Sequence, residues 1–106
     1  MTEFAFEESR RGGVAELALS GDLDMTATFR LEPALDRLLE GEVDELVLDL
    51  ADVSFVDSSG LGLLLATYQR SQDASCPMAI VNSRPEVQRV FRMAGVDDVL
   101  PIDPSP

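Results

Sequence analysis

The chain has 106 residues and carries 20 acidic against 8 basic side chains, which gives a formal net charge of −12. It has no histidine, and all eight basic residues are arginine, so enzymes that need an imidazole base, a lysine Schiff base or a phosphate-loop lysine are excluded. The acidic balance also argues against nucleic acid and anionic membrane surfaces as partners, because both attract basic protein faces.

Two short apolar segments separated by paired glycines predict a β-hairpin at the start of the chain. The bulky residues of the first segment fall on one side, as in a half-buried strand. Gly12-Gly13 is a typical two-residue hairpin turn. We therefore expect strands near residues 3–8 and 13–20.

A helix is predicted after the segment Gly21-Asp22-Leu23-Asp24, with Asp24 or Thr26 as its N-cap. Its apolar residues fall at mostly helical spacing: Phe29, Leu31, Leu35, Leu38 and Leu39. Pro33 is tolerated only near a first turn, so we expect the regular helix to start close to Leu31. Gly41 ends the pattern.

A central strand and a second amphipathic helix follow. The near-continuous apolar run over residues 46–50, with further apolar residues up to 56, is typical of a strand covered on at least one face. The helix after it has apolar residues spaced i, i+3, i+4 and i+7: Leu61, Leu64, Leu65 and Tyr68.

The last third of the chain predicts one more strand and one more helix. Residues 78–81 have the apolar character of a short strand, and Pro85 suits the first turn of a helix that Gly95 ends. Three residues of this helix are expected to face the core: Val87, Val90 and Phe91. Val99-Leu100 is a candidate edge strand, and residues 103–106 are expected to form a loose tail.

The order of these elements predicts a single α/β domain over residues 1–106, with its core over about residues 3–102. An N-terminal hairpin followed by alternating helices and strands implies a mixed β-sheet, in which the later strands pair in parallel. Right-handed crossovers between neighbouring parallel strands place the helices mainly on one face of the sheet.

The single cysteine, Cys76, cannot form an intramolecular disulfide or a cysteine-based zinc site, and it is expected to fill space at a strand edge. One thiol suits a reducing cytoplasm.

The longest apolar stretch is far shorter than the ~20 residues of a membrane span, and the acidic N-terminus does not resemble a signal peptide. We expect a cytoplasmic protein that is a monomer when free.

The segment Asp57-Ser58-Ser59-Gly60-Leu61-Gly62 joins the central strand to the second helix and admits two interpretations. In the first, Asp57 or Ser58 caps the helix and the glycines allow close packing against the sheet. In the second, the free N–H groups and the dipole of the helix start serve an anion or a modification. Spacing alone favours the first.

The stretch from Phe55 to Gly62 closely resembles the phosphorylation segment of STAS-domain anti-sigma factor antagonists, a bacterial family. Three other segments match that family in order and spacing: Gly21-Asp22-Leu23-Asp24, Val47-Leu48-Asp49-Leu50 and Phe91-Arg92-Met93-Ala94-Gly95. The resemblance covers about residues 3–102, which makes it far more specific than an isolated Asp-Ser-Ser-Gly.

This resemblance implies a regulatory protein that is not an enzyme and needs no cofactor. The unphosphorylated form would bind an anti-sigma factor that is a serine kinase and so release the sigma factor. Phosphorylation of Ser58 would abolish that binding, and a phosphoserine phosphatase would restore it. The implied partner-binding residues are Gly21, Asp22, Leu23, Asp24, Asp57, Ser58, Ser59, Gly60 and Leu61.

Several alternatives remain open at this point. The chain could be a STAS scaffold or transport-associated subunit that is never phosphorylated, although such a protein has no need of Ser58. Ser59 is a second candidate phosphosite, but the role of a helix-start residue with an exposed hydroxyl is favoured. Asp22, Asp24 and Asp57 could bind Mg²⁺, but loop and capping roles are favoured because a kinase brings its own metal and nucleotide. A serine hydrolase lacks a base here, and a phospho-aspartate receiver domain would need a lysine.

Overall fold

The computed structural model describes residues 3–103. The elements follow one another as β1 (Ala5–Arg11), β2 (Val14–Leu23), α1 (Met25–Glu40), β3 (Glu45–Val56), α2 (Ser58–Asp73), β4 (Met78–Val81) and α3 (Pro85–Met93). The predicted hairpin is confirmed, but both of its strands run further than expected, to Arg11 and Leu23. Gly12 makes the turn between them with a φ of +62°, which glycine adopts without steric strain.

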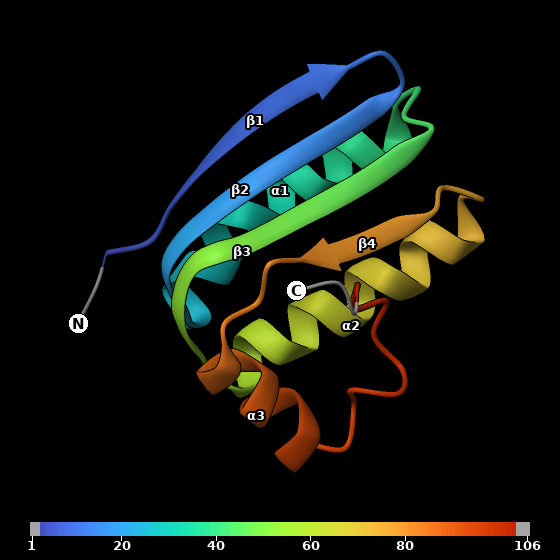
Figure 1. The fold of residues 1–106 in the computed structure, drawn as a ribbon. Helices are drawn as coiled ribbons and strands as arrows, with labels where there is room; N and C mark the ends of the chain where they lie inside the picture. The colour runs from blue at the N-terminus through green and yellow to red at the C-terminus, as the bar shows by residue number, and fades with distance from the viewer. Residues whose placement is uncertain (1–2, 104–106) are drawn as a thin grey trace.

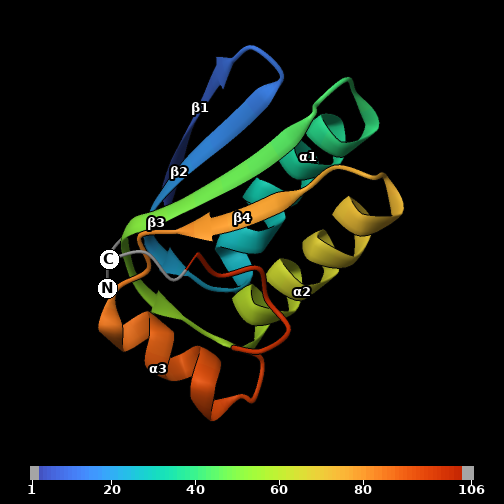
Figure 2. The same cartoon turned by 45° about the vertical axis from the view of Figure 1, so that its right-hand side comes forward.

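The four strands form one mixed sheet in the order β1-β2-β3-β4. β1 is antiparallel to β2, whereas β2, β3 and β4 are parallel to one another. Figures 1 and 2 show α1 and α2 side by side on one face, and α3 at the end of the sheet where β3 and β4 finish. The predicted fold class, a mixed sheet with helices mainly on one face, is therefore confirmed.

The core lies between the sheet and the α1–α2 layer. Leu46, Leu48 and Leu50 of β3 are fully buried, while the residues between them are only half-buried. This alternation of period two shows that the strand is covered on one face only. Val87 and Phe91 of α3 are buried as predicted, and Val90 packs against the core while partly exposed.

Helix α1 starts at Met25, so the prediction of a start close to Leu31 was wrong. The Asp24 carboxylate caps the helix by accepting a hydrogen bond of 3.0 Å from the Ala27 N–H. Pro33 lies inside the helix on its exposed side. A proline there costs about 3 kcal/mol. The buried stripe of Ala27, Leu31, Leu35 and Leu38 offsets this cost, since burial contributes roughly 1.5–3 kcal/mol for each leucine.

The predicted edge strand at Val99-Leu100 was also wrong. These residues form a turn in which the Leu100 N–H donates to Val96 O, and pairing with β4 occurs further on. Ile102 bridges Ile80 in parallel, and hydrogen bonds from Ile80 N to Pro101 O and from Asp103 N to Ile80 O hold it there. Asp103 is thus fixed against the sheet, while residues 104–106 of the expected tail lie outside the described residues.

None of the helices between residues 3 and 103 has the length and apolar character that a membrane crossing requires.

Candidate functional site

The end of β2 and the start of α2 lie against each other at the carboxyl end of the parallel strands (Figure 2). The Asp57 N–H donates a hydrogen bond of 3.3 Å to Leu23 O. Gly60 packs so closely that a Cβ atom at its position would lie 2.2 Å from the same carbonyl oxygen. The fold therefore brings together the two predicted segments, Gly21–Asp24 and Asp57–Leu61.

Asp57 caps helix α2, as the first of the two interpretations expected. Its Oδ1 accepts a hydrogen bond of 3.0 Å from the Gly60 N–H, and its carbonyl oxygen accepts from the Leu61 N–H at 2.9 Å. Ser58 is the first helical residue and is exposed, whereas Ser59 is half-buried. The hydroxyl of Ser58 is thus open to a second molecule at the positive end of a helix dipole, which tolerates an added phosphate.

The carboxylates of Asp22, Asp24 and Asp57, which are the candidate Mg²⁺ ligands, each accept a hydrogen bond within the domain. Asp24 caps α1 and Asp57 caps α2, and Asp22 Oδ1 accepts a hydrogen bond of 3.3 Å from the Ser54 hydroxyl. Across residues 3–103, no three histidine, cysteine, aspartate or glutamate side chains gather closely enough to hold a metal ion. The carboxylates instead make this end of the sheet acidic.

Four of the nine predicted partner-binding residues are buried: Gly21, Leu23, Gly60 and Leu61. Gly21 has a φ of +87°, and a Cβ there would lie 2.3 Å from Glu3 O, so only glycine fits. Leu23 is fully buried in the core. The four buried residues support the candidate site from inside the domain. Its accessible surface is formed by Asp22, Asp24, Asp57, Ser58 and Ser59.

Two large apolar side chains beside this surface were not predicted as part of it. Met25 is 59% exposed and Phe29 is 72% exposed, although the helical spacing had placed Phe29 with the core. Met25, Phe29 and Asp36 are spaced i, i+4 and i+11, so they lie on one side of α1. Asp36 pairs with Arg70 of α2, which shows that this side leans toward α2. We call Met25 and Phe29 the apolar shoulder.

The spacing of α1 contained a signal for the apolar shoulder. The buried stripe runs through Ala27, Leu31, Leu35 and Leu38, in steps of three and four. Phe29 lies two residues from both Ala27 and Leu31, which places it on the opposite side of the helix. A large aromatic residue off the buried stripe is a candidate for binding, because it has no place in the core.

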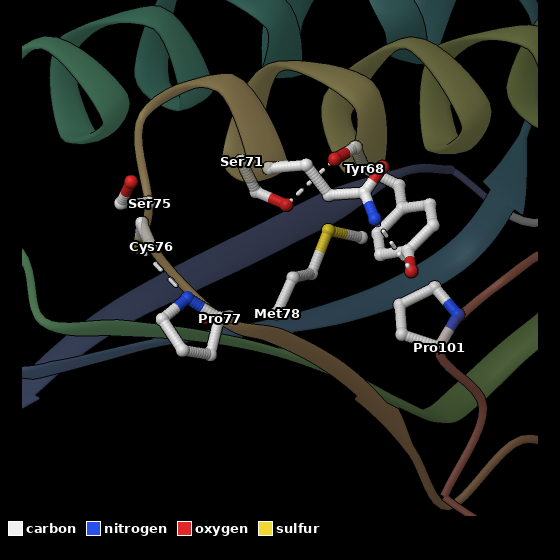
Figure 3. A pocket seen from close by; sticks show the side chains of 8 residues that line it. Tyr68, Ser71, Ser75, Cys76, Pro77, Met78 and Pro101 are labelled. Atoms are coloured by element: carbon white, nitrogen blue, oxygen red, sulfur yellow. Dashed lines mark hydrogen bonds between the residues drawn. The ribbon is translucent and has the colours of Figure 1, made fainter.

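A groove of about 510 Å³ lies at the far end of α2, where the chain turns into β4. Tyr68, Cys76, Met78 and Pro101 are among its lining residues (Figure 3). Cys76 is buried beside the start of β4, as expected, and burial together with Asp44 and Glu45 raises the pKa of its thiol. The thiol therefore stays protonated at neutral pH, and the groove is remote from Ser58, which starts the same helix.

Comparison with known proteins gives a consistent result for the whole chain. The STAS domain family matches residues 6–106. The anti-sigma F factor antagonist of Paenibacillus polymyxa is 31% identical, over 91% of this chain and 83% of its own length. The anti-sigma-B factor antagonist of Staphylococcus aureus (strain COL) is 25% identical, over 83% of this chain and 82% of its own.

Solved structures agree with these relatives. The crystal structure of an anti-sigma factor antagonist from Mycobacterium paratuberculosis superposes with a TM-score of 0.85 at 28% identity, covering 97% of this chain and 87% of that one. The anti-sigma factor antagonist SpoIIAA in its unphosphorylated form gives a TM-score of 0.82 at 23% identity, over 96% and 89% of the two chains. At 23% identity, the likeness to SpoIIAA shows a shared fold.

Proposed function

Because this chain belongs to the STAS domain family, we propose that it is an anti-sigma factor antagonist switched by phosphorylation of Ser58. The unphosphorylated form binds an anti-sigma factor that is also a serine kinase, and the sigma factor is released in the cytoplasm. Phosphorylation of Ser58 abolishes this binding, and a phosphoserine phosphatase restores it. The chain acts as a binding partner and kinase substrate, not as an enzyme.

The observation that carries this proposal is the placement of Ser58. Its side chain is exposed at the first position of α2, directly after the capping Asp57. A kinase can reach the hydroxyl without unfolding the domain, and a phosphate there stays within reach of the helix dipole. Ser59, one position further, is half-buried and less accessible.

The surface around Ser58 indicates the chemistry of the anti-sigma factor. It combines the acidic residues Asp24 and Asp57 with the exposed apolar shoulder, on a chain whose net charge is −12. A complementary surface offers an apolar pocket with arginine or lysine at its rim. Charges of opposite sign speed the encounter, and the buried apolar anchors supply most of the affinity.

Incubation with the cognate anti-sigma kinase and ATP is expected to add one phosphate, on Ser58. Peptide mapping by mass spectrometry locates it, with Ser58→Ala and Ser59→Ala as a matched pair of variants. Labelling should disappear in Ser58→Ala and persist in Ser59→Ala. The reverse pattern would move the switch to Ser59, and the absence of any labelling would favour a STAS scaffold that is never phosphorylated.

Truncation of the apolar shoulder is expected to weaken binding. Phe29→Ala should reduce affinity for the anti-sigma factor at least about tenfold, because aromatic anchors at interface centres commonly contribute more than 1 kcal/mol. The fold should be unaffected, since Phe29 is 72% exposed. Val99→Ala removes another exposed apolar side chain, which is 52% exposed and lies in the turn after α3, and serves as the control. Titration calorimetry giving equal affinities for both variants would exclude the shoulder from the interface.

A further inference from the structure

The outer edge of β1 is open. β1 pairs only with β2, and in Figures 1 and 2 no described element lies beside its other edge. Six of its seven residues are exposed. An open strand edge presents backbone N–H and C=O groups to any chain that can pair with it.

The hairpin geometry determines which backbone groups face outward. Arg11 pairs with Val14 across a two-residue turn, and in such hairpins these flanking residues hydrogen-bond to each other. Hydrogen-bonded positions alternate along an antiparallel pair, so Glu8 and Arg10 direct their N–H and C=O groups away from β2. Phe6, nearer the start of β1, does the same, so these three residues of the strand are the ones available to a further strand.

The charges of β1 are ordered symmetrically. The strand reads Glu7-Glu8-Ser9-Arg10-Arg11, with two acidic residues, a neutral centre and two basic residues. We propose that β1 pairs antiparallel with β1 of a second copy of this chain, about a two-fold axis at Ser9. Glu7 then faces Arg11 of the second copy, and Glu8 faces Arg10, so all four charged positions meet the opposite charge.

This register satisfies the backbone as well as the side chains. Glu8 and Arg10 both face outward, and pairing centred on Ser9 places each opposite the other, so their N–H and C=O groups can form hydrogen bonds to each other. Neighbouring symmetric registers fail. Centring on Glu8 places that carboxylate against its own copy, and centring on Arg10 does the same with guanidinium groups, which is destabilising.

The interface is small, and two electrostatic effects work against it. These are the net charge of each copy and the ion pair that Glu8 already makes within its own chain. Each copy has a net charge of −12, so long-range repulsion slows the encounter. Glu8 already pairs with Arg37 of α1, whereas Glu7, Arg10 and Arg11 have no ion pair within residues 3–103. Self-association is therefore weak and concentration-dependent, and at low concentration the chain is the monomer that the sequence analysis expects. Charged side chains on an edge strand normally deter pairing with another strand. The edge of β1 can still pair with a strand whose charges run in the opposite order.

Sedimentation equilibrium of the full chain up to about 1 mM tests the proposal. The average mass should rise from the 11.5 kDa of one copy toward twice that value. Glu7→Arg and Arg11→Glu should each weaken association at least about tenfold, because each sets like charges opposite one another twice per dimer. Asp98→Arg changes the net charge as much as Glu7→Arg does, but away from β1, and should not weaken association.

Two combinations of these variants restore the charge pairs. A mixture of the Glu7→Arg chain with the Arg11→Glu chain forms a dimer in which every pair is again of opposite sign. The double variant Glu7→Arg with Arg11→Glu does the same within one chain, at unchanged net charge. Both should regain association close to the original. A wild-type mass that stays at 11.5 kDa, or a failure of both combinations to restore association, overturns the proposal.

A disulfide tests the register independently. Residues opposite each other in a non-hydrogen-bonded antiparallel pair have Cα atoms about 4.5 Å apart, within the range for a disulfide. Ser9→Cys in a Cys76→Ala background should therefore cross-link into a covalent dimer on mild oxidation. Glu7→Cys in the same background should not, because the two thiols lie about 13 Å apart along the strands. Equal cross-linking of both variants, or of neither, overturns the register.

Discussion

Phosphorylation of Ser58 is expected to weaken binding to the anti-sigma factor by more than about a hundredfold while the fold stays unchanged. At the interface the phosphate brings roughly −1.5 to −2 charge into a surface built to receive a hydroxyl. Burying an unmatched charge costs roughly several kcal/mol, and a loss of ~3 kcal/mol corresponds to more than a hundredfold in affinity. The domain itself is affected far less.

Two opposing effects of similar size explain why the domain tolerates the phosphate. The first turn of α2 attracts it by about 0.3–1 kcal/mol through free N–H groups and the helix dipole. The nearby Asp57 carboxylate, fixed by its hydrogen bond to the Gly60 N–H, repels it. Ser58 is exposed, so water solvates the phosphate in the free protein. The net change in stability should therefore be small.

Affinity and amide NMR shifts, measured with and without the phosphate, check this expectation together. Ser58→Asn and Ser58→Asp form a matched pair of similar shape that differ in charge. The affinity of the asparagine variant should lie within a few-fold of that of the original chain. The affinity of the aspartate variant should lie between those of the asparagine variant and the phosphorylated form. Shift changes spread through β1–β4 would mean that the phosphate remodels the fold, and equal affinity of all forms would remove the switch.

Replacing Gly60 with alanine is expected to destabilise the domain by about 2–4 kcal/mol. The added Cβ would lie 2.2 Å from Leu23 O and 2.9 Å from Leu23 Cγ, and the carbonyl belongs to the backbone of a buried strand. Neither atom can move away without separating α2 from β2. The hydrogen bond from Asp57 N to Leu23 O at the same junction would be strained as well.

Gly62, two residues further along α2, provides the matched control. A Cβ at Gly62 would have nothing within 4 Å, so alanine there only removes the glycine penalty of a helix. Gly62→Ala should therefore stabilise the domain by about 0.5–1 kcal/mol. In urea unfolding the midpoint should fall by roughly 1–3 M for Gly60→Ala and rise slightly for Gly62→Ala. Similar midpoints for both would show that close packing at Gly60 is unimportant.

The parts of the fold that the sequence predicted correctly are those with local causes. Asp24 and Asp57 each cap the helix that follows within three residues, so their roles are visible in short segments. The apolar run of β3 and the turn at Gly12 are equally local. These signals identified the capping residues and the hairpin, and hence the junction where Ser58 lies, although Pro33 misplaced the expected start of α1.

The errors concern residues whose positions depend on distant parts of the chain. Pro33 breaks an isolated helix, but α1 continues through it because four residues on its other side are buried against the sheet. Ile102 reaches the edge of β4 through a contact with Ile80, which no short segment could indicate. The close approach of Gly60 to Leu23 likewise joins two distant segments, and only the structure separates the roles of Gly60 and Gly62.

The bridge between Ile80 and Ile102 also limits how large an assembly can become. A sheet with two open edges can add copies without end and grow into fibres, because each new copy presents another edge. In this chain the segment around Ile102 occupies the outer side of β4, through hydrogen bonds at Pro101 and Asp103. Two copies joined through β1 would form an eight-stranded sheet whose two outer edges are each covered at Ile80, which disfavours growth beyond the dimer.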